Sequence, residues 1–320
     1  MKRKIVSFAV FFFLLFVSYQ VMNDPHPPNY IDAMNKDAVT VAAQKNDLYQ
    51  QLLQKASQYE VKAQNAKIDK IWKAMPGYNG LKVNIEKSYQ NMKRSGSFDE
   101  KLLVYDQVKP EIHLESLEPE PIYRGHPDKP MVSFLVNVAW GDEYLTQMLP
   151  VLKKNDVKAT FFLEGKWVKN HPDLAKAILN DGHEIGNHSY NHPDMSKLTS
   201  ERISEQLRMT NQQIKETLAV KPKWFAPPSG SFRKEVVEQA RRMGMGTVMW
   251  TVDTIDWQKP QPAVLQHRVL SKVHNGAMIL MHPTEPTAKS LDVLIEKLKE
   301  KGYQIGTVSQ LLNEKRLVVK

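Results

Sequence analysis

Short apolar runs alternate with helix-like segments along the sequence from residue 131 onward. The first run, 131–138, is almost continuously apolar, as is typical of a strand buried on both faces. Further strands are predicted at 157–163, 184–186, 224–225, 246–251, 277–281 and 304–308, and helices at 144–154, 172–180, 200–218, 233–242, 262–273 and 290–301. Strands and helices that alternate with short connections predict a parallel sheet, which is either open or closed into a barrel.

The residues before 126 follow a different pattern. Apolar spacing predicts helices at 47–64 and 68–75, and strands at 80–85, 102–105 and 112–114. A polar helical stretch follows the strand 80–85 and extends to about residue 94. Prolines within 25–28 indicate a linker, and those within 119–130 indicate a join between domains. We therefore expect a linker plus a small α+β domain of unknown role over residues 23–125, and a separate domain over residues 126–320.

The first 22 residues have the pattern of a signal sequence or a membrane anchor. Lys2, Arg3 and Lys4 precede an apolar stretch of 18 residues, from Ile5 to Met22. This is slightly short of the roughly 20 residues that span a membrane. The stretch ends without the small residues that a signal peptidase prefers, which favours an uncleaved anchor over cleaved secretion. Both alternatives place the rest of the chain outside the cytoplasm, at the cell membrane or cell wall of a bacterium.

Composition and charge exclude several kinds of site. The sequence has no cysteine, which excludes disulfides, thiolate metal ligands and thiol nucleophiles. The net charge of +9 divides into +3 over residues 1–22, zero over 23–125 and +6 over 126–320. No basic block is interleaved with aromatic residues, so nucleic acid is not an expected partner. The mild basic excess indicates a solvated surface, or a weak attraction to an anionic cell wall.

Several residues that could carry chemistry follow directly after predicted strands. His188 and His192 are four residues apart, a spacing that suits a divalent metal but also occurs between unrelated surface histidines. Asp253 and Asp256 are either a functional carboxylate pair or a loop cap, and His282 is either an acid–base group or structural. Because the carboxyl ends of parallel strands meet at one edge, these residues together indicate one site.

In this order the motifs resemble the polysaccharide deacetylase (NodB-homology) domain, of the carbohydrate esterase family 4 type, over about residues 134–312. The similar segments are the second strand at 157–165, the metal motif His188-Ser189-x-x-His192, the groove-wall motif Phe225-x-Pro227-Pro228-x-Gly230, the motif Asp253-Thr254-x-Asp256-Trp257, and the general-acid motif Leu280-x-His282. The resemblance implies an α/β fold, a deformed (β/α) barrel, that removes N-acetyl groups from peptidoglycan or chitin-like glycans of the cell wall.

The resemblance also implies roles for individual residues. His188 and His192 would bind a divalent, zinc-like metal, which polarises the acetyl carbonyl and acidifies a water. His282 would protonate the leaving amine, and Asp256 would orient His282 and raise its pKa. The substrate groove would be lined by Trp257, Leu280, Pro227, Pro228 and Ser229, the last through a backbone N–H that faces the oxyanion.

The sequence departs from the family pattern in the first motif. The family has Thr-Phe-Asp-Asp-Gly, and residues 137–141 of this chain are Asn-Val-Ala-Trp-Gly. Ala139 therefore replaces the general base, Trp140 replaces the third metal ligand, and Ala226 replaces an arginine that orients the base. A buried arginine without its carboxylate would be an unpaired charge, so these replacements are consistent with one another. The neighbouring groups that could substitute are Asn137, Asp142 and Glu143.

Two functions from different classes follow from these observations. The chain is either a divergent deacetylase that recruits a neighbouring carboxylate, or a wall-associated glycan-binding or scaffolding protein that has lost hydrolysis. The retained histidines and Asp256 favour the enzyme. The changes at Ala139, Trp140 and Ala226 favour the binding protein, in which the indole of Trp140 would offer a sugar-stacking face. The sequence identifies no protein partner.

Overall fold

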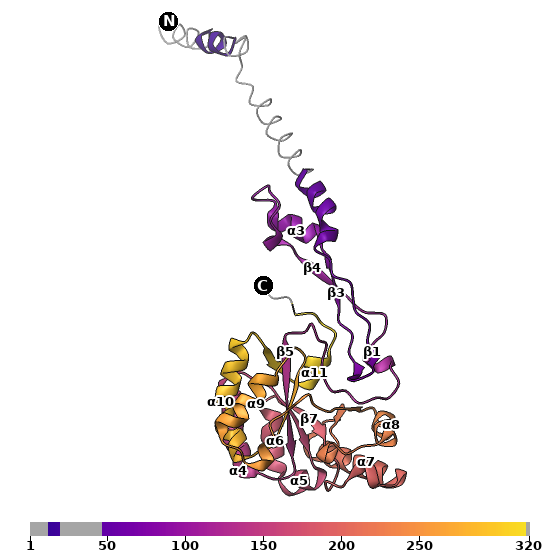
Figure 1. Cartoon of the computed structure of the whole chain (residues 1–320). Coiled ribbons are helices and arrows are strands. Elements are labelled where there is room, and N and C mark those ends of the chain that lie inside the picture. The colour runs from indigo at the N-terminus through magenta and orange to yellow at the C-terminus, as the bar shows by residue number, and fades with distance from the viewer. Residues whose placement is uncertain (1–11, 20–46, 318–320) are drawn as a thin grey trace. The chain divides into compact units, whose positions relative to one another are not determined.

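The computed structural model describes residues 12–19 and 47–317 of the 320-residue chain. Their contacts form two compact units, one within residues 1–60 and 82–106 and the other within residues 61–81 and 107–320. The second unit contains the predicted α/β barrel (Figure 1). It also includes residues 61–81 and 107–125, which the sequence pattern groups with the N-terminal domain. The predicted boundaries at residues 22 and 125 stay predictions.

Residues 12–19 of the predicted N-terminal anchor form a helix whose side chains are exposed. The other residues of the predicted apolar stretch, 5–11 and 20–22, lie outside the described residues. Among the described helices, none combines the length and apolar character that crossing a membrane requires.

The first unit is built on a small helical core. A helix over residues 47–55, which continues as the 3-10 turn Ala56–Gln58, packs on α3 (Ile85–Met92) through the buried side chains Leu48, Leu52, Tyr89 and Met92. The side chain of Asn84 accepts the N–H of Lys87 and so caps α3. The first of these helices is shorter than the predicted 47–64.

Two strand predictions in this region need correction. Residues 100–102, at the start of the predicted strand 102–105, form a 3-10 turn, and the strand β4 (Tyr105–Val108) follows it. β4 pairs with β3 (Gly80–Val83) in a two-stranded sheet, which confirms the prediction of a strand near 80–85. The predicted strand 112–114 is absent from the described chain, and the 3-10 turn Leu114–Ser116 lies there instead.

The helix predicted at 68–75 is wrong, because these residues form a β-hairpin. β1 (Lys67–Asp69) and β2 (Lys73–Met75) pair in antiparallel register. The carboxylate of Asp69 accepts the backbone N–H groups of Ile71 at 2.8 Å and Trp72 at 2.9 Å, which closes the turn. Lys73 adopts a left-handed φ of 57°, which a helix does not allow.

The second unit is built around a curled sheet of eight strands in which every pairing is parallel. The strands are β5 (Met131–Val138), β6 (Thr160–Leu163), β7 (Glu184–Asn187), β8 (Trp224–Phe225), β9 (Gly246–Thr247), β10 (Val252–Asp253), β11 (Met278–Met281) and β12 (Gln304–Gly306). The order is β10-β11-β5-β6-β7-β8-β9, and β12 pairs with the start of β5. Only residues 248–251 join β9 to β10, the two ends of this order, so the sheet curls into a half-barrel (Figure 1). This confirms the predicted parallel α/β fold.

Helices cover the outside of the sheet (Figure 1). They are α4 (Asp142–Lys154), α5 (Gly165–Asn170), α6 (Pro172–Asn180), α7 (Ser200–Leu218), α8 (Lys234–Arg242), α9 (Pro262–Lys272) and α10 (Glu285–Glu300). The short helix α11 (Val308–Leu312) packs instead with the interior side chains. Phe134 and Val136 of β5 pack on this outer layer, whereas Leu135 packs inside with Phe162 and Ala226. Side chains of β5 therefore alternate between the helices and the interior, which decides what faces the site.

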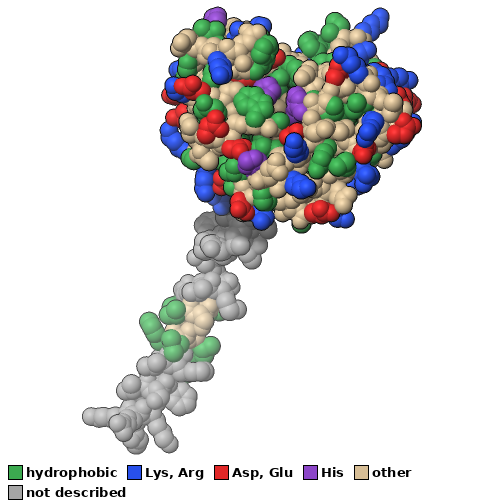
Figure 2. Space-filling view, turned by 90° about the horizontal axis from the view of Figure 1, so that it is seen from below, with side chains coloured by type: hydrophobic (Ala, Val, Ile, Leu, Met, Phe, Trp, Pro, Cys, Tyr) green, Lys and Arg blue, Asp and Glu red, His purple; other side chains and the backbone are tan. Residues whose placement is uncertain are grey.

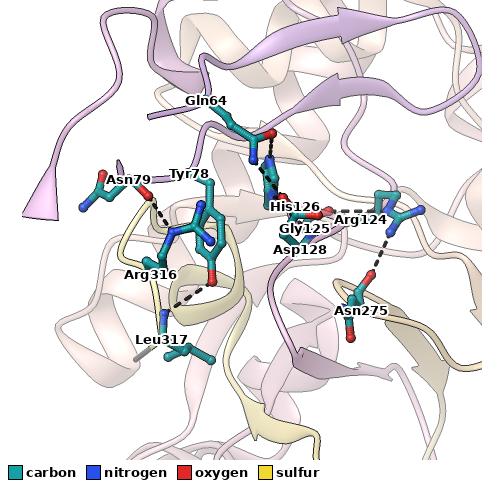
Figure 3. A network of polar contacts seen from close by, with 10 residues as sticks. All are labelled: Gln64, Tyr78, Asn79, Arg124, Gly125, His126, Asp128, Asn275, Arg316 and Leu317. Atoms are coloured by element: carbon teal, nitrogen blue, oxygen red, sulfur yellow. Dashed lines mark hydrogen bonds and ion pairs between the residues drawn. The ribbon is translucent and has the colours of Figure 1, made fainter. Parts of the chain in front are cut away.

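A stacked group of side chains holds residues 61–81 against the barrel within the second unit (Figure 3). The ring of Tyr78 lies between the guanidinium of Arg316, 4.0 Å from its centroid, and the ring of His126, 4.7 Å away. The backbone N–H of Asp128 donates to His126 Nδ1, so the ring proton is on Nε2 and is donated to Gln64 at 3.1 Å. Burial lowers the pKa of His126 from 6.5 to about 4.

We expect His126→Phe to keep the stacking but to destabilise the protein by about 1–3 kcal/mol at neutral pH, because two hydrogen bonds are lost. Between pH 6.5 and about 4, the unfolded chain binds a proton at His126 that the folded protein does not. The wild type therefore loses stability as the pH falls through this window, and its advantage over the variant should shrink. Urea unfolding of both proteins across this pH range measures the difference. A constant difference would contradict the lowered pKa of His126.

Candidate functional site

The parallel register brings the ends of three strands into one layer. Val138, Leu163 and Asn187 are paired across β5, β6 and β7, so the next residues, Ala139, Glu164 and His188, are neighbours. The backbone continues this register, because the N–H of Glu164 donates to Val138 and the N–H of His188 donates to Leu163. The predicted base position therefore lies beside a buried glutamate and a predicted metal ligand.

The two histidines of the predicted metal motif lie together. The His188 ring is buried, and its centroid is 5.1 Å from that of His192. His188 Nδ1 lies 2.8 Å from the carbonyl oxygen of Ala226, which can only accept, so Nδ1 carries the proton and Nε2 keeps a free lone pair. Burial lowers the pKa of His188 to about 3 and also lowers the pKa of His192, so both rings are neutral near pH 7.

The loop that carries these histidines is held by local hydrogen bonds. Ser189 and His192 both have a left-handed backbone, with φ of 63° and 58°. The side-chain oxygen of Asn187 accepts the N–H of Ser189, and the hydroxyl of Ser189 accepts the N–H of His192. These bonds hold a strained turn in place and direct both imidazoles to the same region.

The predicted pair of Asp256 and His282 is also present. Asp256 is fully buried, and one of its oxygens lies 2.8 Å from His282 Nδ1. Its other oxygen accepts the backbone N–H of His282 and the hydroxyl of Thr287, both at 2.6 Å. Burial by itself would raise the pKa of Asp256, but the hydrogen bonds together with the charge of His282 lower it. Asp256 is therefore ionised, and His282 carries its proton on Nδ1; their catalytic roles stay predictions.

Trp140 stands beside this pair. Its ring is parallel to that of His282, with an interplanar angle of 8° and centroids 6.0 Å apart, and 48% of the residue is exposed. Gly141 follows with a φ of 88°, and a Cβ there would lie 2.1 Å from the carbonyl oxygen of Pro283. Only glycine fits this close approach, so the backbone fixes the position of Trp140 next to His282.

The three residues that could substitute for the missing carboxylates differ in their contacts and in their exposure. Asp142 accepts the indole N–H of Trp167 at 2.6 Å and lies 3.0 Å from His171 Nδ1, so both of its oxygens are engaged. Glu143 is exposed to solvent. Asn137 is buried and lies on the interior face of β5, two residues after Leu135. None of the three therefore places a free carboxylate in the layer of Ala139.

The predicted groove residues differ in their exposure to solvent. Trp257 is 56% exposed, and the residues on either side of its turn, Ile255 and Lys259, have left-handed φ values of 51° and 52°. Leu280 is buried on β11. The other predicted groove residues are Pro227 and Pro228, which are buried, and Ser229, which is exposed with a φ of 54°. One face of the molecule carries histidine side chains beside exposed hydrophobic ones, with basic and acidic side chains interspersed around them (Figure 2).

Sequence reasoning missed Glu164. This residue directly follows β6 and caps the start of α5. It is 9% exposed, and burial raises the pKa of its carboxyl, partly offset by Lys166 and by the N–H of Trp167. The signal in the sequence is a carboxylate immediately after an apolar strand. The position of Glu164 beside Ala139, however, depends on the register of the strands.

The residues present do not complete a metal site. A catalytic zinc site has three protein ligands, and the free Nε2 of His188 with the ring of His192 supplies two. Among the residues that the structure describes, no group of three His, Asp or Glu side chains could hold a metal ion. The metal implied by the resemblance therefore does not fit this chain as it stands, because Ala139 and Trp140 offer no ligand.

A cavity of about 670 Å³ lies elsewhere on the same unit. It is bordered by residues 113–122, 221–224, 244–247 and 309–314, and it includes the first residues of β8 and β9. It is therefore at the amino ends of these strands. None of the predicted site residues lines it.

The comparison with known proteins decides the family. A family model described as polysaccharide deacetylase matches residues 124–248. The peptidoglycan-N-acetylmuramic acid deacetylase PdaA of Bacillus subtilis is 32% identical over 201 residues, which cover 61% of this chain and 76% of that protein. The chain belongs to the polysaccharide deacetylase family. Within this family, the protein YlxY of Bacillus subtilis is 69% identical over 318 residues and is covered completely.

A solved structure in the same family is more informative about the altered site. BA3943 of Bacillus anthracis, described as a CE4 family pseudoenzyme, is 56% identical to this chain. The match covers 84% of this chain and 96% of that one, with a TM-score of 0.81. A mutant of BA3943 is described as having restored enzymatic activity, with 55% identity, the same TM-score and coverage of 84% and 99%. This member of the polysaccharide deacetylase family is thus similar to a protein that is described as a pseudoenzyme.

We expect the purified wild-type protein to retain well below one zinc per chain after dialysis, because two imidazoles form an incomplete site. Trp140→Asp should raise the zinc content, since it returns a carboxylate to the position of the third ligand. Elemental analysis of both proteins measures this, with His188→Ala as the control that removes the remaining affinity. Stoichiometric zinc in the wild type would contradict the expectation.

Proposed function

We propose that this chain is a glycan-binding protein of the bacterial cell envelope in which the deacetylation reaction of its family is lost or strongly reduced. The observation that carries the proposal is the layer at the end of β5, where Ala139 and Trp140 stand in place of two carboxylates. The nearest acid in sequence, Asp142, is held by Trp167 and His171. Glu164 is a buried acid beside Ala139, but it follows β6 and not β5, so the carboxylate with which the family's first motif takes a proton from water is absent.

Two aromatic side chains support the glycan-binding part of the proposal. Trp140 and Trp257 are both about half exposed, which is unusual for residues that normally bury most of their surface. A wide aromatic face packs well on the flat apolar side of a sugar ring. PdaA is named for its action on peptidoglycan, so the glycan strand of peptidoglycan is the ligand class that we assign to this chain.

The second candidate function is a divergent but working N-deacetylase, and one observation favours it. Asp256 and His282 keep a fully hydrogen-bonded geometry, with a proton on Nδ1 and the other ring nitrogen turned away from Asp256. In a working enzyme His282 would protonate the leaving amine, and Leu280 and Trp257 would line the acetyl pocket. An amide is a poor electrophile, so this candidate also needs a base in place of the family's carboxylate at position 139.

The proposed location follows from the family and from the N-terminal segment. Relatives such as PdaA are named as peptidoglycan deacetylases, which supports a location outside the cytoplasm. Residues 1–22 begin with three basic residues and continue with an apolar stretch, which supports an uncleaved anchor. We propose that this segment attaches the protein to the membrane and that the barrel faces the wall.

We expect the triple variant Ala139→Asp, Trp140→Asp, Ala226→Arg to release acetate from N-acetylated chito-oligomers at least about 10²-fold faster than the wild type. Each single change should raise the rate by less than about tenfold, because residues that act as one catalytic unit are non-additive. Ala139→Asp alone places a carboxylate beside no arginine and an incomplete metal site. Acetate release by all five proteins, with zinc added, measures the effect.

Two results would change the conclusion. A wild type as fast as the triple variant would show that another group serves as the base, and the second candidate would then replace the first. Triple-variant protein carrying His282→Ala is the matched control, and it should lose the restored rate if His282 is the acid. Retention of that rate would contradict the role assigned to His282.

We expect the native protein to remain in the membrane fraction after a high-salt wash, because an apolar segment is not released by screening charges. Replacing residues 1–22 with a cleavable signal sequence should move the protein to the medium. Fractionation with immunodetection checks both. A mature N-terminus near Asn23 in the culture supernatant would contradict the uncleaved anchor.

A further inference from the structure

The hydrogen-bonding groups at the mouth of the barrel are unbalanced. His188 Nε2 carries a free lone pair, because the ring proton is on Nδ1 and is donated to the carbonyl oxygen of Ala226. The side-chain oxygen of Asn137 is buried and accepts no hydrogen bond from the residues that the structure describes. Both atoms are acceptors. A buried acceptor without a partner costs about 1–3 kcal/mol, so the site favours a ligand that donates.

The register shows that these acceptors face the same space. Asn137 is on the interior face of β5, and the pairing of Met281 with Val136 places His282 beside it. Glu164 and His188 lie in the next layer, around the side chain of Ala139. Alanine fills little of this layer, so the acceptors surround a space that the family's carboxylate would occupy.

The local charge has the same preference. Two buried carboxyl groups, those of Asp256 and Glu164, border the site. Lys166, whose charge acts on Glu164, is exposed, and Ala226 stands where the family has an arginine. No lysine or arginine among these residues is therefore buried next to the acceptors.

We propose, on the basis of the glycan-binding function above, that this site binds the protonated 2-amino group of a deacetylated hexosamine in preference to the acetamido group of an acetylated one. An ammonium group has three donors and no acceptor, which matches the acceptor atoms of Asn137, His188 and Glu164. The protein would then recognise the product of its family's reaction rather than the substrate.

An acetamido group fits the same site poorly. Its carbonyl oxygen needs a donor or a cation, and two of the nearby ring protons are already used: the Nδ1 proton of His188 is donated to Ala226, and that of His282 to Asp256. An acetamido group also has one N–H donor where an ammonium group has three, so it satisfies fewer of these acceptors.

Calorimetric titration of the full chain tests this proposal. The probes are a glucosamine tetramer and an N-acetylglucosamine tetramer, in a mildly acidic buffer where the sugar amines are protonated. We expect the glucosamine tetramer to bind about tenfold more tightly, as a charge-assisted hydrogen bond in a buried site would give. The variants Asn137→Leu and Glu164→Gln should each remove most of this preference, and Glu296→Gln, on the exposed face of α10, is the matched charge control.

The possible results separate this proposal from the function on which it rests. Binding of neither tetramer would overturn the glycan-binding function itself. Equal or tighter binding of the acetylated tetramer would leave that function in place and overturn the preference for the amine. Circular dichroism shows whether the Asn137→Leu and Glu164→Gln proteins fold normally. If either folds normally but keeps the wild-type preference, the preference arises elsewhere, and this result would also overturn the proposal.

Discussion

The parallel register of β5, β6, β7 and β11 is the constraint on which the site depends. Backbone hydrogen bonds set this register, and a shift by one residue would turn every functional side chain to the helical layer. The histidines are then held by groups other than residues 139 and 140: His188 by the carbonyl of Ala226, and His282 by Asp256. Alanine and tryptophan at 139 and 140 therefore leave these hydrogen bonds in place. The proposed loss of chemistry is compatible with retention of the fold for this reason.

The sequence predicts the barrel well because its signals are local. β5 is an almost continuous apolar run, and α7 begins after Thr199, whose side chain caps the helix, so both match their predicted bounds. The hairpin at 67–75 was mispredicted because its apolar residues also fit helical spacing. Two hydrogen bonds to Asp69 decide the conformation of the hairpin, and the spacing of apolar residues gives no information about them. The short strand β8 also matches its predicted bounds, whereas β9 ends at Thr247, four residues before its predicted end.

The site is predictable only in part. Motif order alone identified the histidines, Asp256 and the departures at Ala139 and Trp140, and the structure places these residues at one edge of the sheet. The importance of Asn137 and Glu164 was not visible, because it depends on which strands are neighbours. Whether a buried oxygen has a partner is a property of the folded chain and not of a segment. The tautomer of His188 likewise depends on a carbonyl 38 positions away in sequence.

The backbone around Trp257 has a consequence for binding thermodynamics. Ile255 is β-branched and still adopts a left-handed φ of 51°, as does Lys259 at 52°, conformations that cost of order 1–3 kcal/mol each. The loop tolerates them because Asp253 accepts the N–H of Ile255, and Asp256 that of Lys259. The loop is thus already ordered in the folded protein before any ligand binds. A sugar that stacks on Trp257 loses its own conformational freedom but imposes little further entropy loss on the protein.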